Sequence, residues 1–583
     1  MTEIRPVVKK LNDTIIGLND FQETLMTDAN QKERDIILYF PTVYIHNWKK
    51  KNDYEVYIGE SNNIIQRTKQ HYEASVDDKK WQYQLSKKND ASLYIIGHEH
   101  FNKSMTMDIE NRLMQYMMSV ERVKKVHNMK SNPQGRYYPD DEMESIFQMI
   151  WKKLRRDNKE LFPSESMIRD SAVFKASPLH KLTEEQEQIK NCIIDRVFNG
   201  LDKDEHQLIF VEGEAGTGKT VLNSSTFYEI FVRAEELEQK PLNCCMMVNH
   251  DEQVVVYEQI AQKLGLTDRY GKVVCKPTSF INNHTQDNPI DVAFIDEAHL
   301  LLTQGKQSYT GKNQLKDIIE RAKVTVVMFD ENQILTTEQY WEAQVLDFYK
   351  RKAKEQGNYF ELKNQLRMKA SKEVVNWIDD FTKNRKVAKV PKQKGEYEIK
   401  IFESPFDLER AIKEKAADDN HKLSRMIATY DWKYDRKSSP MEERVKYWEV
   451  LIGNWHKPWN RELNKELDRK TKRKNKSLSW AEQPQTIEEV GSTFTIQGFD
   501  LSYAAVILGP SVQYENGEIV FKPSNNCNDK VKQNRTLSDG TKQKFAETLI
   551  QHEVRVLMTR GVEGLYIYAC DDKLRQALLN STK

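Results

Sequence analysis

Short apolar runs separated by polar, helix-like segments dominate the chain from Leu182 onward. A strand that is covered on both faces shows a continuous apolar run instead of an alternating pattern. The runs are QLIFVEG, NCCMMVN, DVAFIDE, VTVVMFD, YAAVILG and LYIYACD. Their alternation with helical segments predicts an α/β fold built on parallel sheets.

The first part of the chain shows a second, smaller α/β pattern. Residues 42–130 alternate short β-like runs (TVYIHNW, YEVYIG and ASLYIIG) with helical ones. We expect residues 1–41 to form a helical extension and residues 131–177 to form a helical linker. A more polar stretch after residue 372 divides the remainder into two α/β lobes, 178–372 and 373–583.

Composition agrees with a globular protein of about three to four domains. Charged residues make up 30% of the 583 residues and hydrophobic residues 38%. No apolar run reaches the roughly 18 residues of a membrane helix, and the start of the chain, MTEIRPVVKKLND, has no apolar core before a cleavage site. Six cysteines without paired metal spacing indicate a reducing compartment. We therefore expect a cytoplasmic protein that has no membrane partner.

One basic run contrasts with the net charge of only +1. Residues 469–476 read RKTKRKNK. Two interpretations of this run carry equal weight. It is a solvated loop, or it makes an electrostatic contact with a phosphate backbone.

An apolar strand runs directly into a glycine-rich loop at residues 208–220, LIFVEGEAGTGKT. Glycines let such a loop curl so that its N–H groups point at a phosphate, and the helix that follows places its positive end there. Lys219 can reach the β- and γ-phosphates, and the Thr220 hydroxyl can ligate Mg²⁺. The predicted loop consists of Gly213, Glu214, Ala215, Gly216, Thr217, Gly218, Lys219 and Thr220. The sequence therefore predicts a site for a nucleoside triphosphate with Mg²⁺.

Polar residues follow two further apolar strands. In IDVAFIDEAH the carboxylates of Asp296 and Glu297 come at the carboxyl end of a strand, where parallel sheets bind ligands. Asp296 is suited to hold Mg²⁺ and Glu297 to polarise the attacking water. Gln333, in VTVVMFDENQIL, could sense the γ-phosphate or hold that water. Upstream of the loop, in KLTEEQEQI, Gln186 could read an adenine edge through its amide.

Seven motifs occur in the order that superfamily 1 helicases show. They are LTEEQ, GEAGTGKT, IDEAH, DENQ, ELKNQLR, TFTIQGFD and VLMTRG. The chain is still more similar to the Schlafen-group-3-type DNA/RNA helicase family. Three elements carry this similarity: HKPWN at 456–460, EVG with the later QGF, and TRG with the later YIY. This resemblance covers about residues 178–583.

The resemblance implies two RecA-like parallel-sheet lobes with ATP bound between them. Arg367 and Arg560 would reach the γ-phosphate and offset charge on the transferred phosphoryl group. Gln497 and Gly498 would couple the second lobe to nucleotide and nucleic acid. Because long accessory insertions are not obvious, ATP binding and hydrolysis follow more directly than processive unwinding.

Another set of residues precedes the motor-like part, in VYIHNWKKKNDYEVYIGESNNIIQRTKQH. Tyr44 and Tyr57 lie on two short β-like runs. Arg67 and His71 are four residues apart on the helix that follows, so they share one face. Glu110 lies in the helical stretch MDIENRLMQYMM, and Asn128 lies beyond it.

Residues 42–130 resemble the GIY-YIG nuclease family, with VYI and YIG as the two signatures. The resemblance implies that Glu110 anchors one metal ion, Mg²⁺ or alternatively Mn²⁺, and that Arg67 stabilises the attacked phosphate. A tyrosine or a water that it polarises would be the general base, and His71 would assist proton transfer or bind phosphate. Asn132 is a rival to Asn128 for the asparagine role.

The sequence thus predicts an ATP-dependent nuclease–helicase that acts on nucleic acid, on DNA more than on RNA. Antiphage defence or DNA repair would suit such a fusion, with a homo-oligomer or a partner defence protein as further options. One alternative is an ATPase motor whose N-terminal module binds nucleic acid without cutting it. Another is a nucleotide-gated sensor or scaffold with negligible turnover.

Overall fold

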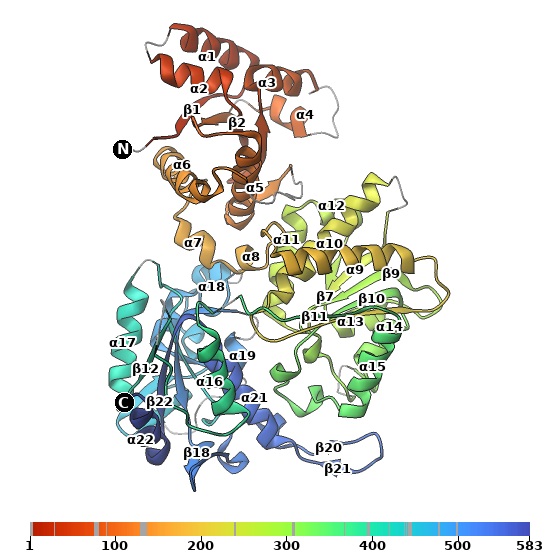
Figure 1. Ribbon diagram of the computed structural model, residues 1–583, viewed down its shortest axis with the longest axis vertical. Coiled ribbons are helices and arrows are strands. Elements are labelled where there is room, and N and C mark those ends of the chain that lie inside the picture. Colours follow the sequence, from red (N-terminus) through yellow and green to blue (C-terminus); the bar gives the residue numbers. More distant parts are fainter. Residues whose placement is uncertain are drawn as a thin grey trace. The chain divides into compact units, whose positions relative to one another are not determined.

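The computed structural model of the chain divides into two compact units (Figure 1). The first consists of Met1–Thr183 with Val256–Val273, and the second of Glu184–Val255 with Val274–Lys583. The structure describes residues 4–27, 30–74, 81–88, 90–128, 137–237, 241–305, 309–366, 368–392, 397–418, 420–435, 438, 440, 446–475, 478–496 and 499–583.

The first unit contains a five-stranded sheet with the order β1-β4-β2-β3-β5. Strands β2 and β3 form an antiparallel hairpin whose last ladder pair is Lys50 with Asp53, and Lys51 turns the chain with a φ of 62°. The strands are β1 (Val7–Asn12), β2 (Thr42–Lys50), β3 (Asp53–Ser61), β4 (Ser92–Gly97) and β5 (Val123–Val126). The helices are α1 (Ile15–Thr27), α2 (Gln31–Tyr39), α3 (Ile64–Glu73), α4 (Trp81–Ser86), α5 (Lys103–Ser119), η2 (Asp140–Glu142), α6 (Met143–Asp157), α7 (Glu165–Asp170), α8 (Ala172–Lys175) and α12 (Leu266–Tyr270).

Two parts of the first unit differ from the predicted organisation. Residues 1–41 are not a purely helical extension, because β1 pairs antiparallel with β4 and completes one edge of the sheet. Residues 131–177 do more than link, because their helices pack on α5. The Tyr116 ring of α5 lies 4.8 Å from the Phe147 ring and 4.9 Å from the Trp151 ring, centroid to centroid. Burial of these large aromatic side chains makes the second segment part of the core, and the buried Val7, Ile36 and Ile37 do the same for the first.

The second unit contains two sheets in which every strand pair is parallel. The first has six strands in the order β11-β6-β10-β9-β7-β8. Its strands are β6 (Gln207–Gly213), β7 (Cys244–Met247), β8 (Val274–Cys275), β9 (Ile290–Ile295), β10 (Ala322–Phe329) and β11 (Tyr359–Leu362). The helical segments between Thr183 and Ser371 are α9 (Glu184–Gly200), α10 (Lys219–Glu236), α11 (Asp251–Lys263, which has residues in both units), α13 (Pro277–Asn283), η3 (Ala298–Leu300), α14 (Gln314–Ile319), η4 (Glu331–Gln333), η5 (Thr337–Gln339) and α15 (Ala343–Glu355).

The second parallel sheet has five strands in the order β12-β22-β17-β13-β16. Its strands are β12 (Glu398–Ile401), β13 (Arg425–Ala428), β16 (Val490–Gly491), β17 (Leu501–Leu508) and β22 (Gly561–Ala569). Small antiparallel pairs accompany it: β14 (Glu449–Ile452) with β15 (Trp455–Pro458), β18 (Val512–Glu515) with β19 (Glu518–Phe521), and β20 (Arg535–Thr536) with β21 (Lys542–Gln543). The helical segments are α16 (Lys372–Thr382), α17 (Pro405–Ala417), η6 (Glu462–Lys465), α18 (Arg469–Asn475), η7 (Pro484–Glu488), α19 (Thr493–Ile496), η8 (Pro523–Asn525), α20 (Asp529–Lys532), α21 (Ala546–Met558) and α22 (Asp572–Ser581).

The six apolar runs predicted as buried strands are confirmed as β6, β7, β9, β10, β17 and β22. Their alternation with helices gives the predicted α/β class. Side chains from both parallel sheets join one hydrophobic cluster, in which Phe210, Val327, Val506 and Ile567 are fully buried. Among the described residues, we find no helix with the length and apolar character needed to cross a membrane.

A buried carboxyl pair, Asp431 and Glu553, lies beside the second parallel sheet. The Asn526 Nδ2 donates to Asp431 Oδ1 at 3.2 Å and to Glu553 Oε2 at 3.3 Å. The Tyr430 N–H donates to Glu553 Oε1 at 2.9 Å. Burial, and then the charge of Asp431, raises the pKa of Glu553 to about 8. Burial also raises the pKa of Asp431 to about 6. Folding therefore keeps a proton on Glu553 at neutral pH.

We predict that Glu553 makes the unfolding temperature fall as pH rises from about 5 to 8. An unfolded Glu553 loses its proton near its ordinary pKa of 4.5, whereas the folded protein holds that proton up to about pH 8. Raising the pH over this window therefore favours the unfolded chain. The unfolding temperature of Glu553→Gln should fall less steeply as pH rises over this window, because the amide stays neutral. Glu547→Gln, at an exposed position of the same helix, should keep the wild-type slope. Equal slopes for all three proteins would contradict the prediction.

Candidate functional site

The glycine-rich loop joins β6 to α10, which begins at Lys219 as predicted. Gly218 precedes the helix with a φ of +80°, a conformation that favours glycine, and a Cβ there would collide with Gln186. The Lys219 Nζ donates to the carbonyls of Gly213 at 2.7 Å and Glu214 at 2.8 Å. The Gln186 Nε2 donates to the carbonyl of Thr217 at 3.1 Å. The loop is thus wrapped around one buried ammonium group.

The ends of the neighbouring strands bring two aspartates to the loop. Asp296 follows β9, and the Thr220 hydroxyl donates to its Oδ2 at 3.1 Å. Asp330 follows β10, and the Lys219 Nζ lies 3.4 Å from its Oδ2. Burial alone would raise the pKa of Asp330, but the Lys219 ammonium holds it below its usual value. An ionised Asp330 therefore helps to position Lys219.

Glu297 has a strained backbone at the end of the same strand. Its φ of 48° is uncommon for a residue with a side chain, and the residue is 6% exposed. The Glu297 Oε2 lies 3.3 Å from the Nε2 of His299, whose pKa is lowered by burial. Backbone strain of this kind concentrates at functional sites, so Glu297 belongs with the candidate residues.

A hydrogen-bonded chain joins Asp330 to the second sheet. The Gln333 Nε2 donates to Asp330 Oδ2 at 2.7 Å, and the Arg560 Nη2 donates to Gln333 Oε1 at 2.7 Å. Arg560 is fully buried and also donates to the Phe499 carbonyl at 3.4 Å. The structure therefore brings the predicted Gln333 and Arg560 together beside the loop.

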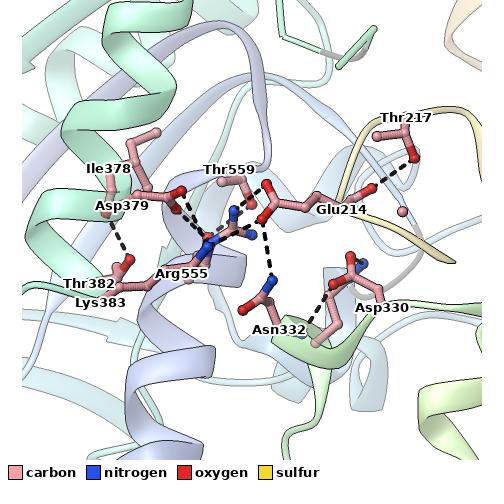
Figure 2. A network of polar contacts seen from close by, with 12 residues as sticks. Glu214, Thr217, Asp330, Asn332, Ile378, Asp379, Thr382, Lys383, Arg555 and Thr559 are labelled. Carbon is pink, nitrogen blue, oxygen red and sulfur yellow. Dashed lines mark hydrogen bonds and ion pairs between the residues drawn. The ribbon is translucent and has the colours of Figure 1, made fainter. Parts of the chain in front are cut away.

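A second group of contacts surrounds the Glu214 carboxylate of the loop (Figure 2). The Arg555 Nη2 donates to Glu214 Oε2 at 2.8 Å, while its Nε donates to Asp379 Oδ1 at 2.9 Å. Lys383 lies 3.2 Å from Glu214 Oε1, and Asn332 donates to the same oxygen at 3.4 Å. The charged loop residue Glu214 is thus tied to α16 and α21.

Arg555 and Asn332 are members of this network that the sequence analysis did not identify. Arg555 is 4% exposed although it carries a charge. A signal was available, because Arg555 is a lone cation within the apolar segment EVRVLM, five residues before Arg560. A charged residue in such a segment is rarely buried without a partner.

The residues at the loop fit a magnesium–triphosphate ligand. The Thr220 hydroxyl and Asp296 carboxylate are adjacent hard oxygen donors, which Mg²⁺ prefers. The Lys219 ammonium and the N-terminus of the eighteen-residue helix α10 supply positive potential for phosphates. Among the described residues, no group of three or more His, Cys, Asp or Glu side chains could hold a metal ion by itself.

Three predicted site residues, Arg367, Gln497 and Gly498, lie outside the described residues, as does Asn132. Their described neighbours do approach the site. The Leu366 N–H donates to the Gly216 carbonyl at 2.7 Å. Phe499 contacts Arg560 through its carbonyl, as described above. The roles predicted for these residues stay predictions.

The first unit has its own cluster of predicted residues, centred on two tyrosines. The rings of Tyr44 and Tyr57 are stacked with centroids 6.2 Å apart, and the Tyr44 hydroxyl lies 2.9 Å from His71 Nε2. Burial raises the pKa of both phenols, and the Arg67 guanidinium opposes the shift. Burial lowers the pKa of His71 to about 3, so its imidazole is neutral at pH 7 and can accept a hydrogen bond from the Tyr44 hydroxyl.

Glu110 and Asn128 complete this cluster. The Asn128 Nδ2 donates to Glu110 Oε1 at 2.9 Å and to the Ile58 carbonyl of β3 at 2.7 Å. The Glu110 charge also raises the pKa of Tyr57, so the carboxylate lies near that phenol. Six residues, from two strands, two helices and the segment after β5, are therefore gathered in one place.

The aromatic surroundings of the tyrosines include groups that the sequence analysis missed. His46, two residues after Tyr44 on β2, places its Nδ1 2.6 Å from Asp13 Oδ2. Trp81 stacks on Tyr57 with ring centroids 4.0 Å apart. The strand periodicity of two could have identified His46, because it shares a face with Tyr44. Asp13 follows the strand β1, which the prediction also missed.

The chain is similar to a protein family and to a yeast protein. A family model described as Schlafen group 3, DNA/RNA helicase domain, matches residues 206–571. A protein of Saccharomyces cerevisiae, "Uncharacterized protein YPL245W", is 31% identical over 468 residues. That alignment covers 74% of this chain and 96% of the yeast protein.

Proposed function

The chain belongs to the Schlafen group 3 DNA/RNA helicase family, and from this premise we propose that it is a nucleic-acid-dependent ATPase motor with two RecA-like lobes. The helicase-like domain is consistent with ATP hydrolysis and with nucleic-acid binding. One observation carries the proposal: Lys219, Thr220, Asp296, Gln333 and Arg560 meet at one sheet edge. These residue types meet the requirements of phosphoryl transfer, which depends on positioning and charge stabilisation.

Each residue has a role that its surroundings support. Lys219 would exchange its contacts with Gly213 and Glu214 for phosphate oxygens, and Thr220 and Asp296 would hold Mg²⁺. Glu297 would orient and deprotonate the attacking water, since it follows directly after Asp296. Bound ATP with Mg²⁺ would supply the phosphoryl group and neutralise part of its charge.

Residues of the second sheet would make turnover depend on lobe arrangement. Arg560, held by Gln333, is proposed to offset charge that develops on the phosphoryl group. We propose the same role for Arg367. Gln497 and Gly498 would couple the second lobe to nucleic acid. In this proposal the protein acts on DNA in preference to RNA. Its biological role would be DNA repair or defence against foreign DNA.

We predict that Lys219→Ala reduces nucleic-acid-stimulated ATP hydrolysis by roughly 10²–10³-fold, as loss of one charge-stabilising donor does elsewhere. Phosphate release with and without single-stranded DNA and RNA measures the effect. Lys316→Ala removes an exposed lysine on α14 and should retain wild-type turnover. Hydrolysis by Lys219→Ala within threefold of the wild type would refute this role.

Arg560→Ala should separate turnover from binding. An arginine that acts on transition-state charge contributes roughly 10³-fold or more to turnover, so kcat should fall while nucleotide affinity changes little. Fluorescent-nucleotide titration and single-turnover hydrolysis measure the two quantities. Because Arg560 is buried, thermal melting of Arg560→Ala and of Arg560→Lys shows whether the fold survives. A folded variant with normal kcat would contradict the role.

We also propose a second function, metal-dependent phosphodiester cleavage by the first unit, in the manner of a GIY-YIG nuclease. The gathering of Tyr44, Tyr57, His71, Glu110 and Asn128 supports it, since these types are spread over separate elements. Glu110 would hold Mg²⁺ or Mn²⁺ as a Lewis acid at the scissile phosphate. Tyr44 and neutral His71, which are hydrogen-bonded to each other, would position the attacking water, and Arg67 would stabilise charge on the attacked phosphate.

Glu110→Gln should abolish cleavage of labelled DNA in Mg²⁺ or Mn²⁺ while leaving ATP hydrolysis unchanged, because the amide loses the charge that holds the cation. Glu121→Gln, at an exposed position just beyond the same helix, is the matched control. Equal cleavage by Glu110→Gln would overturn the nuclease assignment. Absence of cleavage by the wild type with any metal would favour a module that only binds nucleic acid.

A further inference from the structure

Helix α18 (Arg469–Asn475) forms most of the basic run that the sequence analysis left with two interpretations (Figure 1). Asp468 starts the helix by accepting the N–H of Lys470 at 2.7 Å and of Thr471 at 2.9 Å. At its other end the Asn475 Nδ2 donates to Gln485 Oε1 at 3.3 Å, and Asn475 is 7% exposed. The run is therefore an anchored helix and not a solvated loop.

The cations of α18 point away from the anchored side. Residues three and four apart on a helix share one face, so Arg469, Lys472 and Arg473 lie together, with Lys470 next to them. All four are exposed, whereas Thr471 on the opposite side is half-buried and Asn475, one turn after Thr471, is buried. The helix thus presents one continuous positive face.

This face has no compensating carboxylates within ion-pair distance among the described residues. Of its cations, Lys472 donates only to the carbonyl of Lys465, at 3.3 Å. Like charges at a separation of four residues destabilise a helix, and a helix of seven residues has little stability of its own. A polyanion bound along the face would relieve this repulsion.

A half-buried aromatic ring, that of Tyr447, lies beside the start of α18. Glu466 lies two residues before the Asp468 cap and forms an ion pair with Lys446. The Nζ of Lys446 lies 5.1 Å from the centroid of the Tyr447 ring. The Tyr447 hydroxyl also interacts with Glu466. Cations beside a partly exposed aromatic ring are typical of surfaces that bind single strands, where bases stack on the ring and phosphates contact the cations.

We propose that α18 together with Tyr447 forms a binding surface for a single-stranded nucleic acid. The surface deepens the proposed motor function, on which it rests, by naming where and in what form the nucleic acid binds. The net charge of +1 provides almost no general attraction for a polyanion, so a local basic face has to supply it. Tyr447 favours a single strand over a duplex, because paired bases are already stacked.

The test uses the full chain and a labelled single-stranded oligonucleotide, with a duplex of the same sequence, over a range of salt concentrations. Arg469→Gln/Arg473→Gln removes two cations of the face while keeping helix-forming side chains. Loss of two phosphate contacts should make the slope of log affinity against log salt shallower by about 1.4 for the single strand. Affinity at low salt should fall by roughly tenfold or more. The Tyr447→Ala variant should lose roughly tenfold in affinity for the single strand, whereas its affinity for the duplex should change little.

Lys542→Gln/Lys544→Gln is the matched control, because these exposed lysines adjoin the β20–β21 hairpin and carry the same charge change. It should keep the wild-type slope. ATP hydrolysis without nucleic acid, and thermal melting, should be the same in all variants, which shows that folding and the nucleotide site are intact.

The outcomes separate this inference from the proposed function. If the wild type binds no nucleic acid, the motor proposal fails and the surface fails with it. If the wild type binds but the α18 variant shows an unchanged slope, only the α18 surface is overturned. An equal loss on single strand and duplex in Tyr447→Ala would overturn the preference for single strands.

Discussion

The parallel pairing of β6 with β10 and of β10 with β9 is the constraint on which the nucleotide site depends. In this register Glu212 lies opposite Phe329, and Val327 lies opposite Ile295. Neighbouring strands are about 4.8 Å apart, so the loop after β6 and the aspartates after the other two strands emerge side by side. No single segment of the chain could produce that arrangement, because Asp296 is 76 residues from Thr220 and Asp330 is 111 residues from Lys219.

The second parallel sheet completes the site from the outside. Arg560 contacts Gln333, and Arg555 bridges Glu214 to Asp379, so two buried arginines connect the sheets. A buried guanidinium needs partners that satisfy its hydrogen bonds, and here those partners belong to the phosphate-binding loop or to residues beside it. The energetics of burial and the chemistry of the site therefore depend on the same contacts.

The first unit follows the same logic with an antiparallel sheet. The β2–β3 hairpin sets Tyr44 beside Tyr57, and the helices α3 and α5 bring His71 and Glu110 to them. The edge strand β1 adds Asp13, which holds His46 under the tyrosine rings. Here too the reactive groups lie on rigid elements, which fixes their spacing more precisely than loops would.

The sequence by itself determined the local parts of this protein. The buried strands, the phosphate-binding loop and the start of α10 at Lys219 follow from residues that are neighbours in the chain, and so do the motifs that identify the family. The tertiary structure decided the rest: β1 as an edge strand, the packing of residues 143–175 on α5, and the pairing of Arg555 with Glu214. These features depend on contacts between distant segments, and local periodicity carries no record of which distant partner satisfies a buried charge or a strand edge.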